Sequence, residues 1–366
     1  MKEAGDIVAL AVPFTLGTGA GALIKEHLSF MPEHIAAGAA ILFCTVMLVI
    51  FMGRRGGMAT ASALFLTLGI FCYLSYDCSA AGIIVPEHGI RVFPELCLSM
   101  LQDRIHSLPF RHESTNSLVC ALLTGDRSSL SPGHIEAFRT SGASHILALS
   151  GLHLGVIYLI IRKMLSFIGN SCTARKARSA ITVAFSGFYT VMTGAAPSIV
   201  RAFLFILLNE LSSLSPERRR SLPGTLLAAL TIQLTLRPTV ISSLGFQLSY
   251  LAMSGIMFVY PRLSSWYPDD GLLKGMNPLK KLWDSMALTV SCQIFTAPLV
   301  WLRFHTFPKY FIITNLIALP MTSAVMSVSV AVICLSSMGI CPDILVRADE
   351  FLVQGLLFAL QCISAM

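Results

Sequence analysis

Long apolar runs, separated by short polar segments, dominate the hydrophobic pattern of this chain. A helix needs about 20 apolar residues to cross a bilayer, and most of the runs reach or approach that length. The pattern therefore predicts an all-α, polytopic membrane protein with about eleven transmembrane helices, in a range of nine to twelve. The predicted spans cover residues 7–24, 35–52, 58–76, 146–161, 180–194, 198–211, 222–236, 241–260, 283–302, 310–335 and 351–366.

One long segment, residues 77–145, contains no run that could cross a membrane. Within it, residues 94–108 mix apolar and charged positions at helical spacing, which predicts an amphipathic helix at the membrane interface. Ser131 followed by Pro132 is typical of a helix start, so we expect a short helix over residues 132–140.

Three parts follow from this pattern. Residues 1–76 form a predicted N-terminal segment of three membrane helices, residues 77–116 an external linker with the amphipathic helix, and residues 117–366 a transmembrane domain. Several spans of that domain are short or contain Gly and Pro, which leaves room for broken or re-entrant helices.

Composition agrees with a membrane protein. Hydrophobic residues make up 55 % of the chain, charged residues only 12 %, and the mean hydropathy is +0.74. A soluble domain carries about 25 % charged residues, so an ordinary soluble enzyme and a disordered chain are both excluded. The ten cysteines form no CxxC pair, and several lie in apolar runs. We therefore expect no metal site, no disulfide framework and no cofactor.

The net charge of +7 has two explanations. Basic cytoplasmic loops would produce it, and so would a basic path for an anionic substrate such as nucleic acid. If the N-terminus is cytoplasmic, the strongest basic clusters all fall on the cytoplasmic side, as the positive-inside rule requires. These clusters lie within residues 54–55, 162–178, 218–220 and 274–281.

The densest group of unusual residues lies between Gly125 and Gly155. His145 and His153 share one face of the predicted helix, and Ser150 lies three residues before His153. Gly151 and Gly155 form a GxxxG pattern, which lets a second helix approach closely. Three roles remain open for the histidines: hydrogen-bonded packing, lining of a polar path, and acid–base or metal chemistry.

Further polar residues interrupt the later spans. Each one alone is more often a contact between helices, but together they suggest a hydrated interior. Pro197 opens a span and Pro320 is expected to kink or unwind another. The interrupting residues are Arg201, Gln247, Tyr250, Gln293 and Asn315.

Five ordered motifs resemble the signature of the ComEC competence-protein family. Two of them, GDRSSLSP at 125–132 and AFRTSGASHILALSGLHLG at 137–155, are close to the family patterns GDRSGLSP and AFxxTGxxHLLAxSGLHxG. The other three are GAAPSIVR at 194–201, GFQLSY at 245–250 and NLIALP at 315–320. The resemblance covers roughly residues 117–358.

The resemblance implies a channel of the bacterial inner membrane that conducts single-stranded DNA into the cytoplasm. We expect no enzymatic activity, because the nuclease-like domain that many family members carry has no counterpart in this sequence. It also implies partners: a DNA receptor, cytoplasmic proteins that draw in the strand, and the lipid bilayer, with self-association left open. Arg127 and Arg201 would contact phosphates, and Phe246 and Tyr250 are candidate platforms for bases. The expected substrate path comprises Asp126, Arg127, His145, Ser150, His153, Arg201, Gln247, Tyr250, Gln293 and Asn315.

Two domains common in the family are missing from this sequence. Residues 77–92 are too few for an external OB-fold, and no zinc-ligand motif of a metallo-β-lactamase domain occurs. The sequence therefore leaves other functions open, namely a channel or transporter for another anionic solute, or a degenerate copy. A third alternative is an intramembrane hydrolase that uses Ser150 and His153, although such an i,i+3 pair on one helix rarely reaches nucleophile–base geometry.

Overall fold

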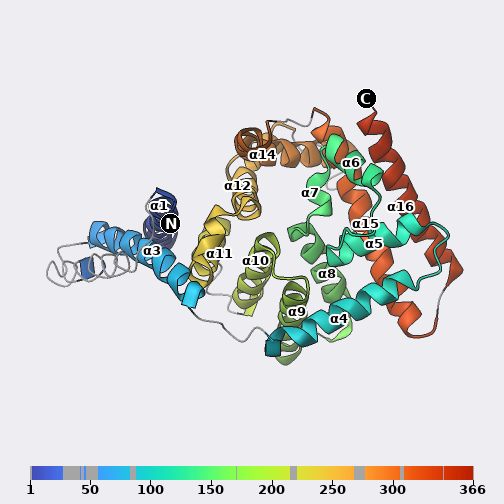
Figure 1. Ribbon diagram of the computed structural model, residues 1–366, viewed down its shortest axis with the longest axis horizontal. Coiled ribbons are helices and arrows are strands. Elements are labelled where there is room, and N and C mark those ends of the chain that lie inside the picture. The colour runs from blue at the N-terminus through green and yellow to red at the C-terminus, as the bar shows by residue number, and fades with distance from the viewer. Residues whose placement is uncertain are drawn as a thin grey trace. The chain divides into compact units, whose positions relative to one another are not determined.

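The computed structural model describes residues 2–27, 42, 45–46, 57–82, 88–169, 171–214, 221–267, 277–305, 309–340 and 342–365, and every regular element in these ranges is a helix (Figure 1).

The predicted span 35–52 and the basic clusters at 54–55 and 218–220 lie largely or wholly outside the described residues. The elements are α1 (Lys2–His27), α3 (Gly57–Gly82), α4 (His88–His106), α5 (Glu113–Thr124), α6 (Pro132–Thr140), α7 (Ser144–Leu147), α8 (Gly151–Met164), η2 (Leu165–Phe167), α9 (Cys172–Met192), α10 (Pro197–Leu214), α11 (Leu222–Leu236), η4 (Pro238–Ser242), α12 (Leu244–Phe258), α13 (Tyr260–Ser264), α14 (Pro278–Phe304), α15 (Phe311–Ser337) and α16 (Asp343–Ser364).

The helices group into two units by packing. The first unit comprises Met1–Gly89 and Leu204–Tyr250, and the second comprises Ile90–Phe203 and Leu251–Met366. This grouping follows contacts between helices, whereas our three predicted parts follow membrane topology, which packing alone does not test.

Close contact between α1 and α3 organises the first unit. A Cβ atom added to Gly17 would lie 2.0 Å from the carbonyl oxygen of Leu66, and one added to Gly69 would lie 2.3 Å from that of Phe14. Small residues at a helix crossing let two backbones meet, which is a common way to join helices whose surfaces are all apolar. Apolar side chains are spread around both helices, so hydrophobicity alone does not select the face by which each helix packs. The glycines at the crossing select that face.

A nearly completely buried helix, α5, forms the centre of the second unit. Leu118, Val119 and Leu122 have no exposed surface and belong to one apolar cluster. The same cluster contains Met326 of α15 and Leu356 of α16, two helices that run side by side in Figure 1. The sequence leaves α5 unassigned because it is too short to cross a membrane, yet burial on all sides makes it a core element.

Two sequence predictions in this region are confirmed. Residues 132–140 form α6, and the Ser131 side chain accepts a hydrogen bond of 3.3 Å from the main-chain N–H of His134, as expected of a helix cap. The predicted helix over 94–108 is present as α4, which begins earlier, at His88, and ends at His106, while its place at a membrane interface stays a prediction.

The prediction of one continuous span over 146–161 is wrong. The chain leaves helical geometry after α7, and α8 starts afresh at Gly151. Ser150 is extended, its hydroxyl accepts from the N–H of Leu152, and the His153 ring accepts from the N–H of Ser150. This reciprocal cap stabilises a new helix start and therefore a break in the apolar run.

The predicted span 241–260 is also divided. It consists of the end of η4, all of α12 and the start of α13. Pro261 follows the first residue of α13 and has no N–H to continue the hydrogen bonding of α12, which ends at Phe258. By contrast, α15 continues through Pro320 without interruption, so the expected unwinding at this proline does not occur.

The number of spans is not confirmed. Among the described residues, four helical segments are long and apolar enough to cross a membrane: Ile7–Glu26, Pro197–Leu214, Pro278–Phe304 and Phe311–Ser337. Three shorter apolar helices, Ala61–Tyr76, Leu222–Leu236 and Leu244–Phe258, fall below that length. The all-helical, apolar architecture stands, and about eleven crossings remain a prediction.

We expect Gly69→Ala to destabilise the protein, because its methyl group would meet main-chain atoms of α1 that cannot move aside. Overpacking of this kind costs about 1–3 kcal/mol, which thermal unfolding of the purified protein in detergent would measure. Gly19→Ala is the matched control, since its methyl group would lie 3.7 Å from the nearest atom, at ordinary contact distance. Equal unfolding temperatures for the two variants would contradict a tight α1–α3 crossing.

Candidate functional site

The loop after α5 is held by the first two charged residues of the signature. Gly125 ends α5 with a φ of 82°, a conformation that favours glycine. Asp126 accepts hydrogen bonds from the N–H of Ser128 at 2.9 Å and from the Gln102 amide at 3.3 Å. The bond from the Ser128 backbone is the main reason that the pKa of Asp126 lies below its ordinary value.

Arg127 fastens this loop to the helix break. Its Nε donates to the carbonyl oxygen of Leu147, the last residue of α7, at 3.0 Å. A cation at the C-terminal end of a helix satisfies an orphan carbonyl and complements the helix dipole. The structure therefore gives Asp126 and Arg127 a positioning role at the start of the candidate site.

The break between α7 and α8 contains the Ser150–His153 pair. The hydroxyl oxygen of Ser150 lies 3.0 Å from Nδ1 of His153, and the N–H of Ser150 donates to the same nitrogen at 3.1 Å. A main-chain N–H can only donate, so Nδ1 is unprotonated and the ring proton sits on Nε2. His153 has no exposed surface, and Nε2 has no hydrogen-bond partner among the residues that the structure describes.

Arg201 of α10 lies against the start of α8. A Cβ atom added to Gly151 would lie 3.1 Å from Nη2 of Arg201 and 3.4 Å from Cβ of Ala202. The glycine thus lets a guanidinium approach the first turn of α8. Gly155, the other half of the GxxxG pattern, faces open space among the described atoms, so only Gly151 serves close approach.

His145 lies near this pair. Its Nδ1 is 3.2 Å from the carbonyl oxygen of Gly142, and the residue is exposed. Gln293 lies in α14, directly after Cys292. Asn315 of α15 has a buried Oδ1 without a partner among the described residues.

Gln247 and Tyr250 belong to the first unit. The Tyr250 hydroxyl donates to Gln233 at 3.0 Å, and the Gln247 amide donates to the carbonyl of Ile241 at 2.8 Å. Phe246 and Tyr250 are buried, with ring centroids 4.7 Å apart. Burial leaves these aromatic rings little free face on which a base could stack. Within the second unit, the structure pairs Ser150 with His153 and brings Arg201 against Gly151, the residue after Ser150.

Sequence reasoning missed two polar clusters. Both oxygens of fully buried Asp349 lie near the Ser329 hydroxyl, at 3.1 and 2.8 Å. Its neighbour Glu350 accepts from the N–H groups of Arg111 and His112, each at 2.9 Å, and contacts the His112 ring at 2.8 Å. The signal that could have found them is an acidic pair directly before a predicted apolar span.

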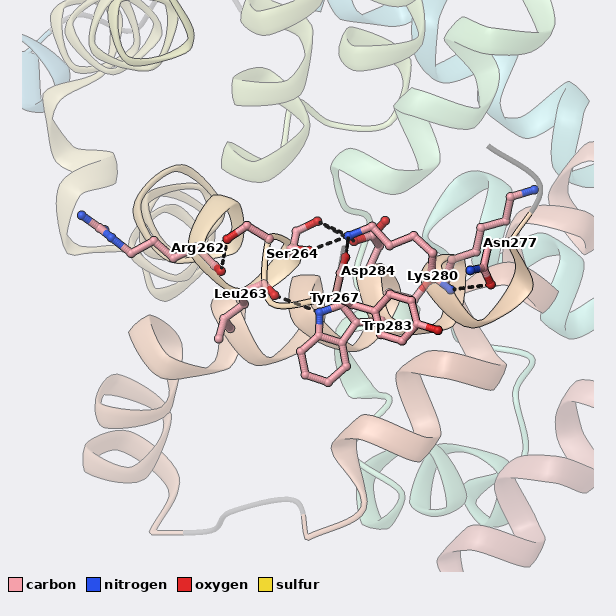
Figure 2. Close-up of polar contacts among 11 residues, drawn as sticks. Arg262, Leu263, Ser264, Tyr267, Asn277, Lys280, Trp283 and Asp284 are labelled. Atoms are coloured by element: carbon pink, nitrogen blue, oxygen red, sulfur yellow. Dashed lines mark hydrogen bonds and ion pairs between the residues drawn. The ribbon is translucent and has the colours of Figure 1, made fainter. Parts of the chain in front are cut away.

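A third cluster joins α13 to α14 (Figure 2). The ammonium group of Lys280 donates to the carbonyl of Tyr267 at 2.9 Å and lies 3.1 Å from Asp284, which also accepts from the Ser264 hydroxyl. Trp283 donates to the carbonyl of Leu263 at 2.8 Å. Lys280, expected only as part of a basic loop, thus caps the end of α13. Among the described residues, no group of His, Cys, Asp and Glu side chains is arranged to hold a metal ion.

Comparisons with known proteins agree on one family. The family model described as "Competence protein" matches residues 122–366. The chain is 26 % identical over 235 residues to ComE operon protein 3 of Bacillus subtilis (strain 168), a match that covers 60 % of this chain and 27 % of that protein. It is 23 % identical over 248 residues to the uncharacterized protein YcaI of Escherichia coli (strain K12), covering 66 % of this chain and 31 % of YcaI. An uncharacterized protein of Aquifex aeolicus (strain VF5) is 30 % identical over 151 residues, covering 41 % of this chain and 34 % of that protein. The matched region is thus about a quarter to a third of each relative, and no solved structure matches the chain.

We expect the Glu350 carboxylate to make stability depend on pH. Burial raises its pKa, but the hydrogen bonds from His112 and Arg111 outweigh burial and hold the pKa below its ordinary value. Its contribution is therefore complete above about pH 4.3, the pKa of an unfolded glutamate, and is lost as the pH falls through the lower folded-state value.

Glu350→Gln should lower the free energy of unfolding by about 1.5–3 kcal/mol at neutral pH, the range for hydrogen bonds to charged groups. Chemical denaturation of both proteins across pH 7 to 3 would show the difference shrinking at low pH. A constant difference at every pH would contradict a role for the charge.

Proposed function

Because this chain belongs to the competence protein family, we propose that it is a channel component through which single-stranded DNA enters a bacterial cell during natural transformation. The family match and the similarity to ComE operon protein 3 support a role in DNA uptake at the family level. We propose a transport role for the chain and no enzymatic one.

The position of Arg201 against the start of α8 carries this proposal. Arg201 lies in α10, a helix long and apolar enough to cross a membrane. A charged side chain within a membrane is costly, and such residues usually face the bundle interior or a water-filled path. The N-terminus of α8, next to Arg201, adds main-chain N–H donors. Helix N-termini of this kind bind anionic substrate groups in membrane transporters. A polyanion would therefore be stabilised at this point.

We further propose that the chain lies in the bacterial inner membrane with a cytoplasmic N-terminus and about eleven crossings. α4 supports an interfacial segment, because Val92, Phe93, Leu96 and Met100 are each more than half exposed. These four residues share one face of α4, which continues one turn further into Asp103 and Arg104, while Glu95 lies on another face. In this scheme a separate DNA receptor presents the strand and cytoplasmic proteins draw it in.

Deletion of the gene should abolish import of DNA into the cytoplasm of competent cells, because no other path for the strand would remain. Uptake of labelled DNA into a nuclease-resistant form, and the number of transformants, would measure the effect. Restoration by the wild-type gene on a plasmid is the control. Unchanged import and transformation under competence-inducing conditions would overturn the proposal.

A channel for another anionic solute is the alternative that the sequence leaves open. Proteoliposomes that contain the purified chain would separate the two, by comparing flux of oligonucleotides with flux of small anions. Flux of small anions without oligonucleotide transport would favour the alternative.

One contact favours a second candidate, an intramembrane hydrolase. The Ser150 hydroxyl lies 3.0 Å from Nδ1 of His153, within reach of a nucleophile–base pair. An i,i+3 pair on one helix rarely reaches this geometry, but Ser150 is the extended N-cap residue and not part of the helix. Against hydrolysis, Nδ1 also accepts the N–H of Ser150, and Nε2 has no orienting acid among the described residues.

Ser150→Asn separates the two candidates. Asn caps a helix about as well as Ser does, but it cannot act as the nucleophile. We expect DNA import by this variant to stay within about threefold of wild type, consistent with a change in capping energy of a few tenths of a kcal/mol. Complete loss of function in a stably folded Ser150→Asn protein would favour the hydrolase.

A further inference from the structure

A buried carboxyl in α16, that of Asp349, has a single hydrogen-bonding partner. The residue has no exposed surface. Among the described residues, its two carboxyl oxygens bond only to the hydroxyl of Ser329 in α15, at 3.1 and 2.8 Å. A hydroxyl has one proton to donate, whereas an ionised carboxylate has about four acceptor positions. An ionised Asp349 would therefore be left mostly without donors.

Apolar side chains surround this contact. Val346 and Val353 lie one turn before and one turn after Asp349 on α16, and Val332 lies one turn after Ser329 on α15. All three valines are buried and belong to apolar clusters of the second unit. Burial among such side chains disfavours the charged form of a carboxyl, because water does not solvate it.

The elements that pack against α16 are α15, α5 and α6, and they bring no cation to this carboxyl. Helix α15 contains no Asp, Glu, Lys, Arg or His. Glu350 is bonded by Arg111 and His112, and Glu136 of α6 lies 3.7 Å from Arg139. The other titratable groups on these four helices are Glu113, Cys120, His134, Cys334, Asp343, Arg347 and Cys362. None of these groups is among the causes that shift the pKa of the buried aspartate.

The pKa of Asp349 agrees with this geometry. Burial is the larger effect and raises the pKa to about 7, although the hydrogen bond from Ser329 acts in the opposite direction. Glu350, the next residue, accepts from two main-chain N–H groups and has a lowered pKa. These neighbouring carboxyls precede the predicted span 351–366, and they hold different charges in mildly acidic solution.

We propose that Asp349 is a proton-binding site that keeps α16 packed against α15. The neutral carboxyl is satisfied by one hydrogen bond with Ser329 and needs no cation, so the two helices can close over it. When this contact opens, water solvates the carboxyl and the proton leaves. The bound proton is thus the ligand of the closed contact. The site goes beyond the proposed transport function and does not depend on which solute is transported.

The direction of the pH dependence follows from the raised pKa. A solvated Asp has a pKa of about 3.9, so below that pH the carboxyl holds its proton in both the closed and the open contact. From there to about pH 7 only the closed contact holds it, and each pH unit favours opening by a factor of about ten. The stabilisation by the proton is therefore complete below about pH 3.9 and is lost as the pH rises to about 7.

Infrared spectra of the purified chain in a non-ionic detergent test the protonation state. Ordinary Asp and Glu side chains are almost fully ionised at about pH 6, so a C=O band of a protonated carboxyl at that pH marks Asp349. We expect this band in the wild type, and its loss with a midpoint near pH 7. Asp349→Asn, which keeps the size and shape of the neutral carboxyl, should lack the band. Glu350→Gln is the matched control and should keep it.

Ser329→Ala provides a second, independent variant. The hydrogen bond from Ser329 lowers the pKa of Asp349, so its removal should move the midpoint of the infrared band to higher pH. This variant retains the carboxyl, and it keeps the test decisive if Asp349→Asn does not fold. An unchanged midpoint in a folded Ser329→Ala protein would contradict the assignment of the proton to this pair.

Amide hydrogen exchange of α16, corrected for the intrinsic effect of pH on exchange, measures opening of the contact. Between about pH 5 and pH 7 we expect opening to increase about tenfold per pH unit in the wild type and to stay constant in Asp349→Asn. Absence of the infrared band at pH 6 in the wild type, its persistence in Asp349→Asn, or equal pH dependence of exchange in both proteins would overturn the proton site. A midpoint that falls when sodium chloride replaces choline chloride would identify a bound sodium ion instead and would also overturn it.

Discussion

The reciprocal hydrogen bonds between Ser150 and His153 are the constraint on which the candidate site depends. They end one helix and begin another inside an apolar run that would otherwise form a single span. A continuous helix bonds its interior main-chain N–H groups internally, whereas a new helix start leaves its first N–H groups without an intrahelical acceptor. The break therefore places polar donors within an apolar run. Arg201 approaches the first residue of this new helix, Gly151.

Hydrogen bonds to main-chain carbonyls hold the surroundings of this break in place. Arg127 bonds to the last residue of α7, Tyr189 of α9 donates to the carbonyl of Leu123 at 2.8 Å, and Thr314 of α15 donates to that of Ser141 at 2.7 Å. Each bond joins a side chain of one element to the end of another. In an apolar setting an unmade bond of this kind is expensive, so these contacts define one arrangement of the helices around α5.

Sequence and structure agree best where local chemistry decides the outcome. The start of α6 at Pro132 follows from Ser131 and Pro132 alone, since a cap and a preset φ act over a few residues. Agreement is poorest for apolar runs. Hydrophobicity determines that a run is buried or faces lipid, but it does not determine whether the run forms one continuous helix. The runs at 146–161 and 241–260 are each divided, at a capping pair and near Pro261. For the site, sequence reasoning linked Ser150 with His153 by their spacing, but it could not bring Arg201 to them, and it missed Asp349 and Glu350.

By itself the sequence determined that this chain is an all-helical, membrane-type protein of the competence family, with its few charges sorted into loops and a small internal set. Composition and short motifs suffice for this, because they depend on residue types and spacing alone. Only the tertiary structure decided which polar residues meet. Arg201 lies 50 positions after Gly151 in the chain, yet its guanidinium reaches the start of α8 because helix packing brings α10 there. In the same way, the Tyr250 hydroxyl of α12 meets Gln233 of α11 only because these two helices pack together.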